Sequence, residues 1–365
     1  MYAVLINQTA LIAYLRRIKY ARCIEWLSMC CCERNAESFF ISSDSVDDDV
    51  RETLSSTVRS ALLGSQDGQL RCSWRVLVAV VITFGAVFGF ILTVRAVGID
   101  PPGWAEIAVV HPAAVIGVLI AMVLLKRYVD RWDITDYGFN LSRQWGADTL
   151  AGFALGVFVV SVLFVIEYQQ GGVQIVGTWT DAAAVPIVLQ VGILLLGWIA
   201  LGVWEETLFR GIFITNAIEG LMSRGFSDRA VILGALVSSS IVFGFSHGIS
   251  GAISTGDSLL YALVMTSISG VLYGWAYLLS GELAFSIGLH TGVNLTTTML
   301  ISSSGATYPK VVEYSVSGRS IGLNTSDPAI LLFVFAIEFL IISGYFYFQY
   351  GAVVPDPNHS GSRSV

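Results

Sequence analysis

Long apolar runs dominate the chain from Val76 onward, and short polar segments separate them. A helix needs about 20 apolar residues to cross the roughly 30 Å hydrocarbon core of a bilayer, and several runs reach or approach that length. The pattern predicts an all-α, polytopic transmembrane helical bundle of about eight spans. We expect these spans at about 76–94, 105–125, 149–166, 186–206, 230–247, 258–279, 283–301 and 328–350.

The polar segments predict how the chain is organised around these spans. Residues 1–27 are apolar with a basic patch and suggest a helix lying on the membrane, whereas the acidic residues 42–69 are typical of a disordered linker. We therefore expect five regions. They are an N-terminal cytoplasmic segment, partly disordered (1–70), the first three spans (71–185), a core that holds the candidate catalytic residues (186–301), a loop with the last span (302–350) and a C-terminal tail (351–365).

Composition and charge narrow the class of protein. Only 13% of the residues are charged, against about 25% in soluble globular proteins, which indicates lipid as the solvent. A formal net charge of -7 leaves no basic surface for nucleic acid. Basic residues gather before the first span and between the second and third, so the positive-inside rule places both segments in the cytoplasm. An even number of spans then predicts a multi-pass protein of the cell membrane with both termini cytoplasmic.

Charged residues inside the fourth apolar run carry the first chemical signal. Glu205, Glu206 and Arg210 each cost about 2.5–3.5 kcal/mol at the centre of a span, so each needs a reason to be there. Glu206 and Arg210 are four residues apart, the spacing of a helical ion pair. Glu205 projects about 100° away and stays free. A salt-bridge patch at a helix end is the plainer interpretation.

Two histidines in later apolar runs carry the second signal. His247 follows Phe243 by one helical turn, and His290 precedes Asn294 by one turn on a shared face. Taken singly, these residues suit a satisfied core histidine and polar contacts between helices. Taken with Glu205, they supply a hydrolytic site, because a carboxylate and an imidazole can activate water while an imidazole and an amide stabilise an oxyanion.

These residues form three motifs, Glu205-Glu206-x-x-x-Arg210, Phe243-x-x-x-His247 and His290-x-x-x-Asn294. Together the motifs resemble those of the CAAX-protease and bacteriocin-processing (CPBP) family, which includes type II CAAX prenyl endopeptidases. The resemblance covers roughly residues 195–300. It implies about eight helical spans around an active site that lies in a cavity inside the membrane, open to the cytosol and laterally to lipid.

The resemblance also implies a role for each motif residue. Glu205 would be the catalytic glutamate, Glu206 would hold the site together with Arg210 as its counter-ion, and His247 would help to activate water. His290 and Asn294 would form the oxyanion hole, and Phe243 would pack beside the active-site cavity.

The sequence leaves the use of a metal open. Glu205, His247 and His290 are also a plausible three-ligand zinc set, although the H-E-x-x-H helix of soluble zinc proteases is absent. We favour water activation that requires no cofactor, with a divalent metal such as zinc as the alternative.

One geometric problem follows from the predicted spans. They place Glu205 and His290 near the cytoplasmic ends of their helices but His247 near the far end of its own, so the three could not meet. Either the fourth helix continues well past Glu206 into an amphipathic stretch near 212–222, or the fifth span is tilted or re-entrant. We favour the first.

Four further polar residues lie in or beside apolar runs. Glu338 is expected to pair inside the bundle, His111 to lie at the membrane interface, and Asp148 and Glu167 to mark the ends of the third span.

The resulting hypothesis is an intramembrane endopeptidase. Its partners would be membrane lipid and a peptide or membrane-anchored protein substrate, with no nucleic acid. A non-enzymatic membrane scaffold or bacteriocin-immunity protein and a proton-coupled transporter are the alternatives, although a transporter is expected to show an internal repeat that this chain lacks.

Overall fold

The computed structural model describes eight stretches of the chain. They comprise residues 62–63, 70–98, 105–129, 132–181, 185–255, 259–304, 308–316 and 328–350. The predicted surface helix, most of the predicted acidic linker and the C-terminal tail lie outside these residues.

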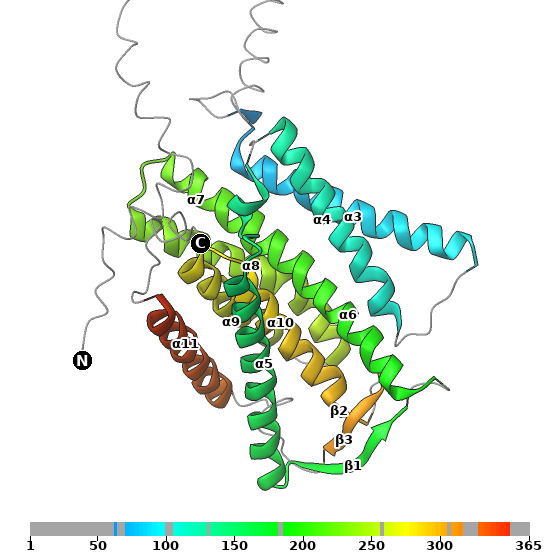
Figure 1. Ribbon diagram of the computed structural model, residues 1–365. Helices are drawn as coiled ribbons and strands as arrows, with labels where there is room; N and C mark the ends of the chain where they lie inside the picture. The colour runs from blue at the N-terminus through cyan, green and yellow to red at the C-terminus, as the bar shows by residue number, and fades with distance from the viewer. Residues whose placement is uncertain are drawn as a thin grey trace, which may run out of the picture.

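Helices form most of the described structure, and seven of them are long and apolar enough to cross a membrane. This confirms the predicted all-α polytopic bundle (Figure 1) and a multi-pass membrane protein. The main helices are α3 (Cys72–Ala96), α4 (Glu106–Tyr128), α5 (Arg143–Gln169), α6 (Ile187–Glu206), α7 (Thr215–Met222), α8 (Asp228–Thr255), α9 (Leu259–Ser280), α10 (Ala284–Leu295) and α11 (Pro328–Tyr350). A short 3-10 helix, η3 (Ile134–Tyr137), precedes α5.

The expected span at 283–301 is shorter than predicted. Helix α10 has 12 residues and continues only as the five-residue π-helical segment η5 (Thr296–Leu300) before the chain becomes extended. It is therefore not among the seven helices that could span a bilayer.

The fourth helix is longer than a bilayer requires. Helix α6, the π-helical segment η4 (Thr207–Ile214) and α7 form one run of 36 residues, which at 1.5 Å per residue is about 54 Å long. Glu205 consequently lies near the middle of the run rather than at its end. The continuation to Met222 confirms the prediction that the fourth helix extends well past Glu206.

A small sheet that the sequence did not predict lies at one end of the bundle, where α5 ends and α6 begins (Figure 1). Strands β1 (Val173–Thr180) and β3 (Lys310–Val316) pair antiparallel, and β2 (Ile301–Ser303) runs parallel to β3, in the order β1-β3-β2. The Thr180 hydroxyl donates to the Glu313 carboxylate at 2.8 Å, and Lys310 approaches it at 3.2 Å. These contacts hold the pKa of Glu313 below its usual value.

Glycines bring α5 and α10 into backbone contact. Gly152 and Gly156 on α5 face α10, and Gly288 and Gly292 on α10 face α5. At all four positions an added Cβ would meet backbone atoms of the other helix within van der Waals distance. Both helices thus carry the small-xxx-small spacing that permits close packing of membrane helices.

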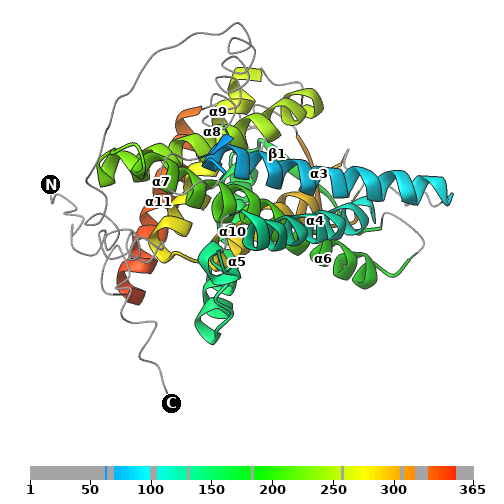
Figure 2. The ribbon, with the colours of Figure 1, turned by 90° about the horizontal axis from the view of Figure 1, so that it is seen from above.

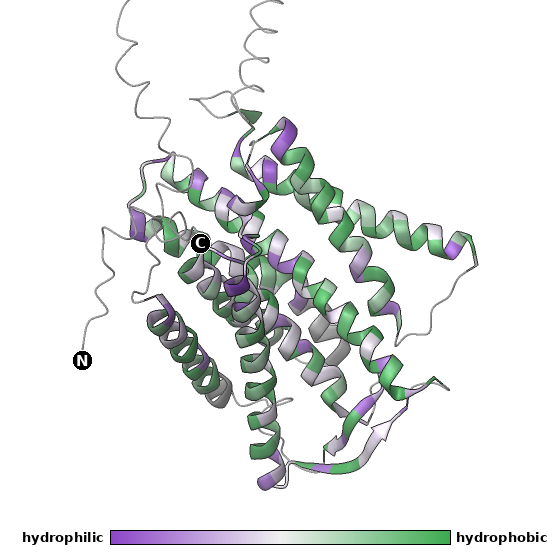
Figure 3. Ribbon diagram, viewed as in Figure 1, coloured by the Kyte–Doolittle hydropathy of each residue, from purple (hydrophilic) through white to green (hydrophobic). Residues whose placement is uncertain are grey.

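Helices α3 and α4 form a hairpin beside the rest of the bundle, with α3 on its outer side (Figure 2). The Arg75 guanidinium binds the Glu219 carboxylate of α7 at 2.9 Å and anchors the start of α3. Further along α3 the residues are mostly apolar (Figure 3). Many of their side chains are exposed, Phe88 and Leu92 among them. Such a surface suits contact with lipid acyl chains.

Asp148 and Glu167 are buried near the two ends of α5, five residues after its start and two before its end. Asp148 accepts hydrogen bonds from Gln144, Tyr345 and Tyr350 at 2.7–2.8 Å. A buried carboxylate with three donors needs no neutralising cation. The network joins the beginning of α5 to the end of α11.

Candidate active site

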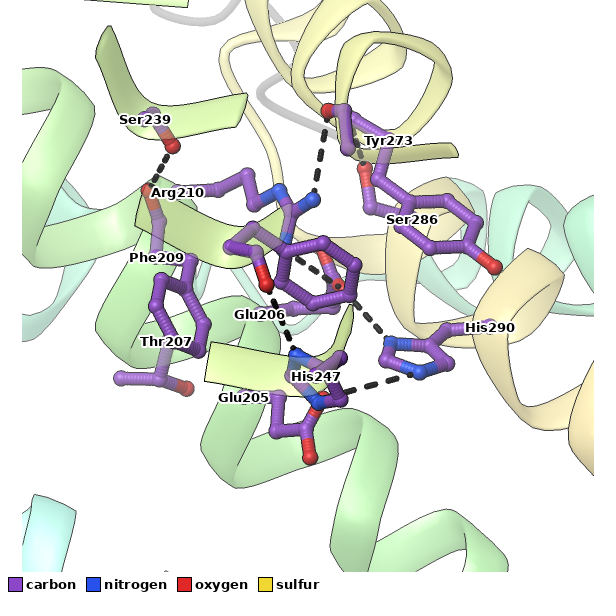
Figure 4. A network of polar contacts seen from close by, with 12 residues as sticks. Glu205, Glu206, Thr207, Phe209, Arg210, Ser239, His247, Tyr273, Ser286 and His290 are labelled. Carbon is purple, nitrogen blue, oxygen red and sulfur yellow. Dashed lines mark hydrogen bonds and ion pairs between the residues drawn. The ribbon is translucent and has the colours of Figure 1, made fainter. Parts of the chain in front are cut away.

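Three helices bring the predicted acidic and imidazole residues together. Glu205 and Glu206 end α6, His247 comes from α8, and His290 comes from α10 (Figure 4). Both carboxylates and His290 are buried, whereas a third of the His247 side chain is exposed. The cluster therefore lies inside the bundle and is open at His247.

The predicted ion pair between Glu206 and Arg210 is present. Arg210 Nη1 lies 3.2 Å from Glu206 Oε1, and Nη2 donates to the Gly270 carbonyl oxygen of α9 at 3.2 Å. The same Glu206 oxygen lies 2.7 Å from His290 Nδ1. Because neither Glu206 nor Arg210 is exposed to solvent, each depends on the other for charge compensation.

Both imidazoles direct one nitrogen toward Glu205. His247 Nε2 lies 3.0 Å from Glu205 Oε2, and His290 Nε2 lies 3.7 Å from the same oxygen. His247 is close enough to share a proton with this buried oxygen, although neither contact is aligned well enough to be a full hydrogen bond. Such an atom is a natural acceptor for a proton of water or substrate.

The opposite ring nitrogens also have polar partners. His247 Nδ1 lies 3.0 Å from the Phe243 carbonyl oxygen and 2.8 Å from the Ser246 hydroxyl, so it can donate to the first or accept from the second. His290 Nδ1 likewise faces the carboxylate oxygen of Glu206. In both rings Nε2 is left as the nitrogen that exchanges protons toward Glu205.

A change of helix type follows the two glutamates directly. The backbone is α-helical up to Glu206 and π-helical over Thr207–Ile214. The Thr207 hydroxyl donates back to the Val203 carbonyl oxygen at the junction. Segments of π-helix inside α-helices occur frequently at functional sites, where they alter the direction of nearby side chains.

Phe243 packs between Arg210 and His247. The Arg210 guanidinium carbon lies 4.3 Å from the Phe243 ring centre, within the range of a cation–π interaction. The His247 ring lies 4.3 Å away from the same ring. Phe209 meets Phe243 edge to face at 5.2 Å and closes this side of the cluster.

Tyr273 on α9 belongs to the cluster, although the sequence analysis did not single it out. Its ring stacks on the His290 imidazole at 4.8 Å with an interplanar angle of 13°, and Arg210 lies 5.2 Å from its centre. The Ser286 hydroxyl donates to the Tyr273 carbonyl oxygen at 2.8 Å and ties α10 to α9. No motif spacing reveals this residue, because its contacts join separate helices.

Two other predicted residues stand apart from the hydrogen-bonded cluster. Asn294 is partly buried one turn after His290, and within the described structure its side chain makes no hydrogen bond to the cluster. Glu338 is buried on α11, and the expected pairing is not seen, since no ion pair joins it to another described residue.

The proposed zinc ligands do not form a metal site as they are placed. Across the described ranges, no group of three or more His, Cys, Asp or Glu side chains is arranged to hold a metal ion. The 3.0 Å approach of His247 Nε2 to Glu205 brings the two groups into direct contact with each other. We derive no chemical step through a metal.

Comparison with protein families supports the resemblance seen in the motifs. Residues 186–296 match the model of the Rce1-like type II CAAX prenyl endopeptidases. The match confirms the resemblance to the CPBP family over this segment, which contains every motif residue, and it supports a protease-type function in general. No curated protein and no solved structure matches the chain significantly.

Proposed function

We propose that the protein is an intramembrane endopeptidase that hydrolyses a peptide bond of a membrane-associated peptide or protein. The observation that carries the proposal is the convergence of two imidazole Nε2 atoms on one buried oxygen of Glu205. The family match over residues 186–296 supports the same class of reaction.

Glu205 and His247 would activate the attacking water. Water donates one proton to the carboxylate or to His247 Nε2 while its oxygen bonds to the carbonyl carbon of the substrate. The same proton then passes to the amine as the carbon–nitrogen bond breaks. Positioned acid–base groups of this kind contribute typically 10²–10⁴-fold to the rate.

His290 and Asn294 would stabilise the oxyanion that forms in this step. Because Nδ1 of His290 faces the Glu206 carboxylate, a second proton on Nε2 makes the ring a cation that can donate to the oxyanion. Glu206 compensates that charge, and Arg210 keeps Glu206 in place. The amide of Asn294 is one turn away on the same helix and supplies a second donor.

The position of the site suggests where the substrate binds. Glu205 lies near the middle of a 36-residue helical run, so the peptide bond must reach the interior of the bundle. A peptide or membrane-anchored protein that enters from the bilayer meets this requirement, and a nucleic acid does not. We further propose that both chain termini face the cytoplasm.

The test compares purified, detergent-solubilised wild type with Glu205→Gln on a library of quenched fluorescent peptides. The variant is close to isosteric but cannot accept a proton, so we expect cleavage to fall by about 10²-fold or more. Glu106→Gln is a matched control, because Glu106 is exposed at the start of α4 and distant along the chain from the motifs. Equal cleavage by wild type and Glu205→Gln would falsify the mechanism.

A chelator added to the wild-type assay decides the role of a metal. Activity that survives prolonged chelation supports activation of water by side chains alone. Activity that is lost and then restored by zinc supports a metal-dependent reaction. Well-folded wild type that cleaves no peptide in the library would favour a non-enzymatic scaffold.

A further inference from the structure

His111 lies against the catalytic helix rather than at the membrane interface where the sequence placed it. It is partly buried on α4, and its ring stacks between Trp198 and Trp204 of α6 with 6.3 Å between ring centres in each case. Trp204 Nε1 donates a hydrogen bond to His111 Nδ1 at 3.2 Å. His111 is thus a third histidine beside the site, and no family motif includes it.

The partner of His111 immediately precedes Glu205. The Trp204 side chain is buried between the two outer helices, because Phe84 of α3 contacts its ring edge to face at 6.0 Å. The hairpin of α3 and α4 thus packs against the residue that directly precedes Glu205.

The hydrogen bond determines which chemical groups can replace His111. An indole N–H only donates, so Nδ1 of His111 must be an unprotonated acceptor and Nε2 carries the proton of the neutral ring. An asparagine carbonyl oxygen occupies nearly the same position as Nδ1 and cannot lose this role through protonation. The hydrogen bond from Trp204 thus requires an acceptor atom at the position of His111 Nδ1, and a side chain other than imidazole can supply it.

We propose that His111 is a positioning residue, which fixes the Trp204 indole and through it the direction of the Glu205 carboxylate toward His247 and His290. The inference rests on the proposed function. The need for such a restraint follows from the backbone, because the π-helical segment begins two residues after Glu205 and ends the regular α-helical support.

The experiment compares kcat, KM and thermal unfolding of His111→Ala, His111→Asn, Trp204→Phe and the double variant His111→Ala with Trp204→Phe. We expect both His111→Ala and Trp204→Phe to lower kcat by about tenfold or more at unchanged KM, since small misplacements of catalytic groups are costly. The double variant should be no slower than either single variant, because both remove one interaction. His111→Asn should recover most of the rate.

Trp275→Phe is the matched control. It also removes a partly buried indole hydrogen bond, which Trp275 Nε1 of α9 donates to the Ser343 hydroxyl of α11 at 2.9 Å. We expect its kcat to equal that of wild type.

The outcomes separate this inference from the proposed function. Cleavage by wild type that is lost in Glu205→Gln establishes the function, and an unchanged kcat in His111→Ala then overturns only the role of His111. A raised KM, or no recovery in His111→Asn, also overturns it and indicates a direct contact with substrate. If His111→Ala does not fold, Trp204→Phe and His111→Asn decide the question. No cleavage by wild type overturns both.

Discussion

Replacing Gly156 by alanine tests whether close packing of α5 against α10 holds His290 in place. A Cβ at Gly156 would lie 2.6 Å from the Leu289 carbonyl oxygen and 2.7 Å from the Val293 backbone nitrogen. Both atoms belong to the turn of α10 that carries His290. Backbone atoms cannot rotate away as a flexible side chain can, so α10 must move.

The size of the movement can be worked out from these contacts. Ordinary van der Waals contact begins at 3.4 Å, so the Leu289 oxygen must retreat by about 0.8 Å. The same displacement would lengthen the 2.7 Å contact between His290 Nδ1 and Glu206 Oε1 to the limit of a hydrogen bond. Because a misplacement of 1 Å can cost about 10²-fold, we expect kcat of Gly156→Ala to fall by that order. Overpacking should lower the free energy of unfolding by about 1–3 kcal/mol.

The assay is peptide cleavage with kcat and KM determined separately, together with thermal unfolding of the purified protein. Gly192→Ala on α6 and Gly344→Ala on α11 are the controls, because a Cβ at either position meets nothing within 4 Å. Both should keep the wild-type kcat and gain slight stability, since alanine favours a helix over glycine. Wild-type kcat in Gly156→Ala would refute the idea that α5 positions His290.

Substitutions at three further residues probe the supports of the fold and the site. Tyr345→Phe removes one hydrogen-bond donor to the buried Asp148 carboxylate. It should lower the free energy of unfolding by about 1.5–3 kcal/mol without a change in kcat. A lower kcat would show that the hydrogen bonds of Asp148 affect catalysis. Tyr273→Phe keeps the ring that stacks on His290 and should retain the wild-type kcat, whereas Tyr273→Leu removes the ring and should lower kcat. Equal kcat values of the two variants would exclude a role for the stacking. Arg210→Ala leaves Glu206 buried without its cation and should lower the free energy of unfolding by about 3–5 kcal/mol. Thermal unfolding measures the effect, and wild-type stability of the variant would contradict the importance of the ion pair.

The sequence allowed much of the cluster to be predicted, because the cost of charge in a membrane is high. Glu205, Glu206 and Arg210 could not face lipid, so they had to meet polar groups elsewhere in the chain. His247 and His290 were the histidines available in the central apolar runs. Helical spacing predicted the ion pair between Glu206 and Arg210, and the structure contains it.

Residues whose role depends on contacts between separate helices could not be found in this way. Tyr273 and Trp204 are ordinary aromatic residues of apolar runs, and only the packing of the helices brings them to the cluster. His111 precedes a proline near a helix start, a position that equally suits the membrane interface. The paired glycine spacings on α5 and α10 were visible in the sequence, but one spacing alone does not identify its partner helix.

The length of α10 shows why hydrophobicity alone made its apolar run resemble a full span. Ten of its twelve residues are buried within the protein, whereas only three of the 25 residues of α3 are. An apolar run of 10–14 residues suits a buried core helix as well as part of a span, and hydropathy does not distinguish the two. A helix surrounded by protein can carry His290 and Asn294 without exposing either to lipid. Its shortness and its burial therefore permit His290 to face Glu205 inside the protein rather than toward lipid.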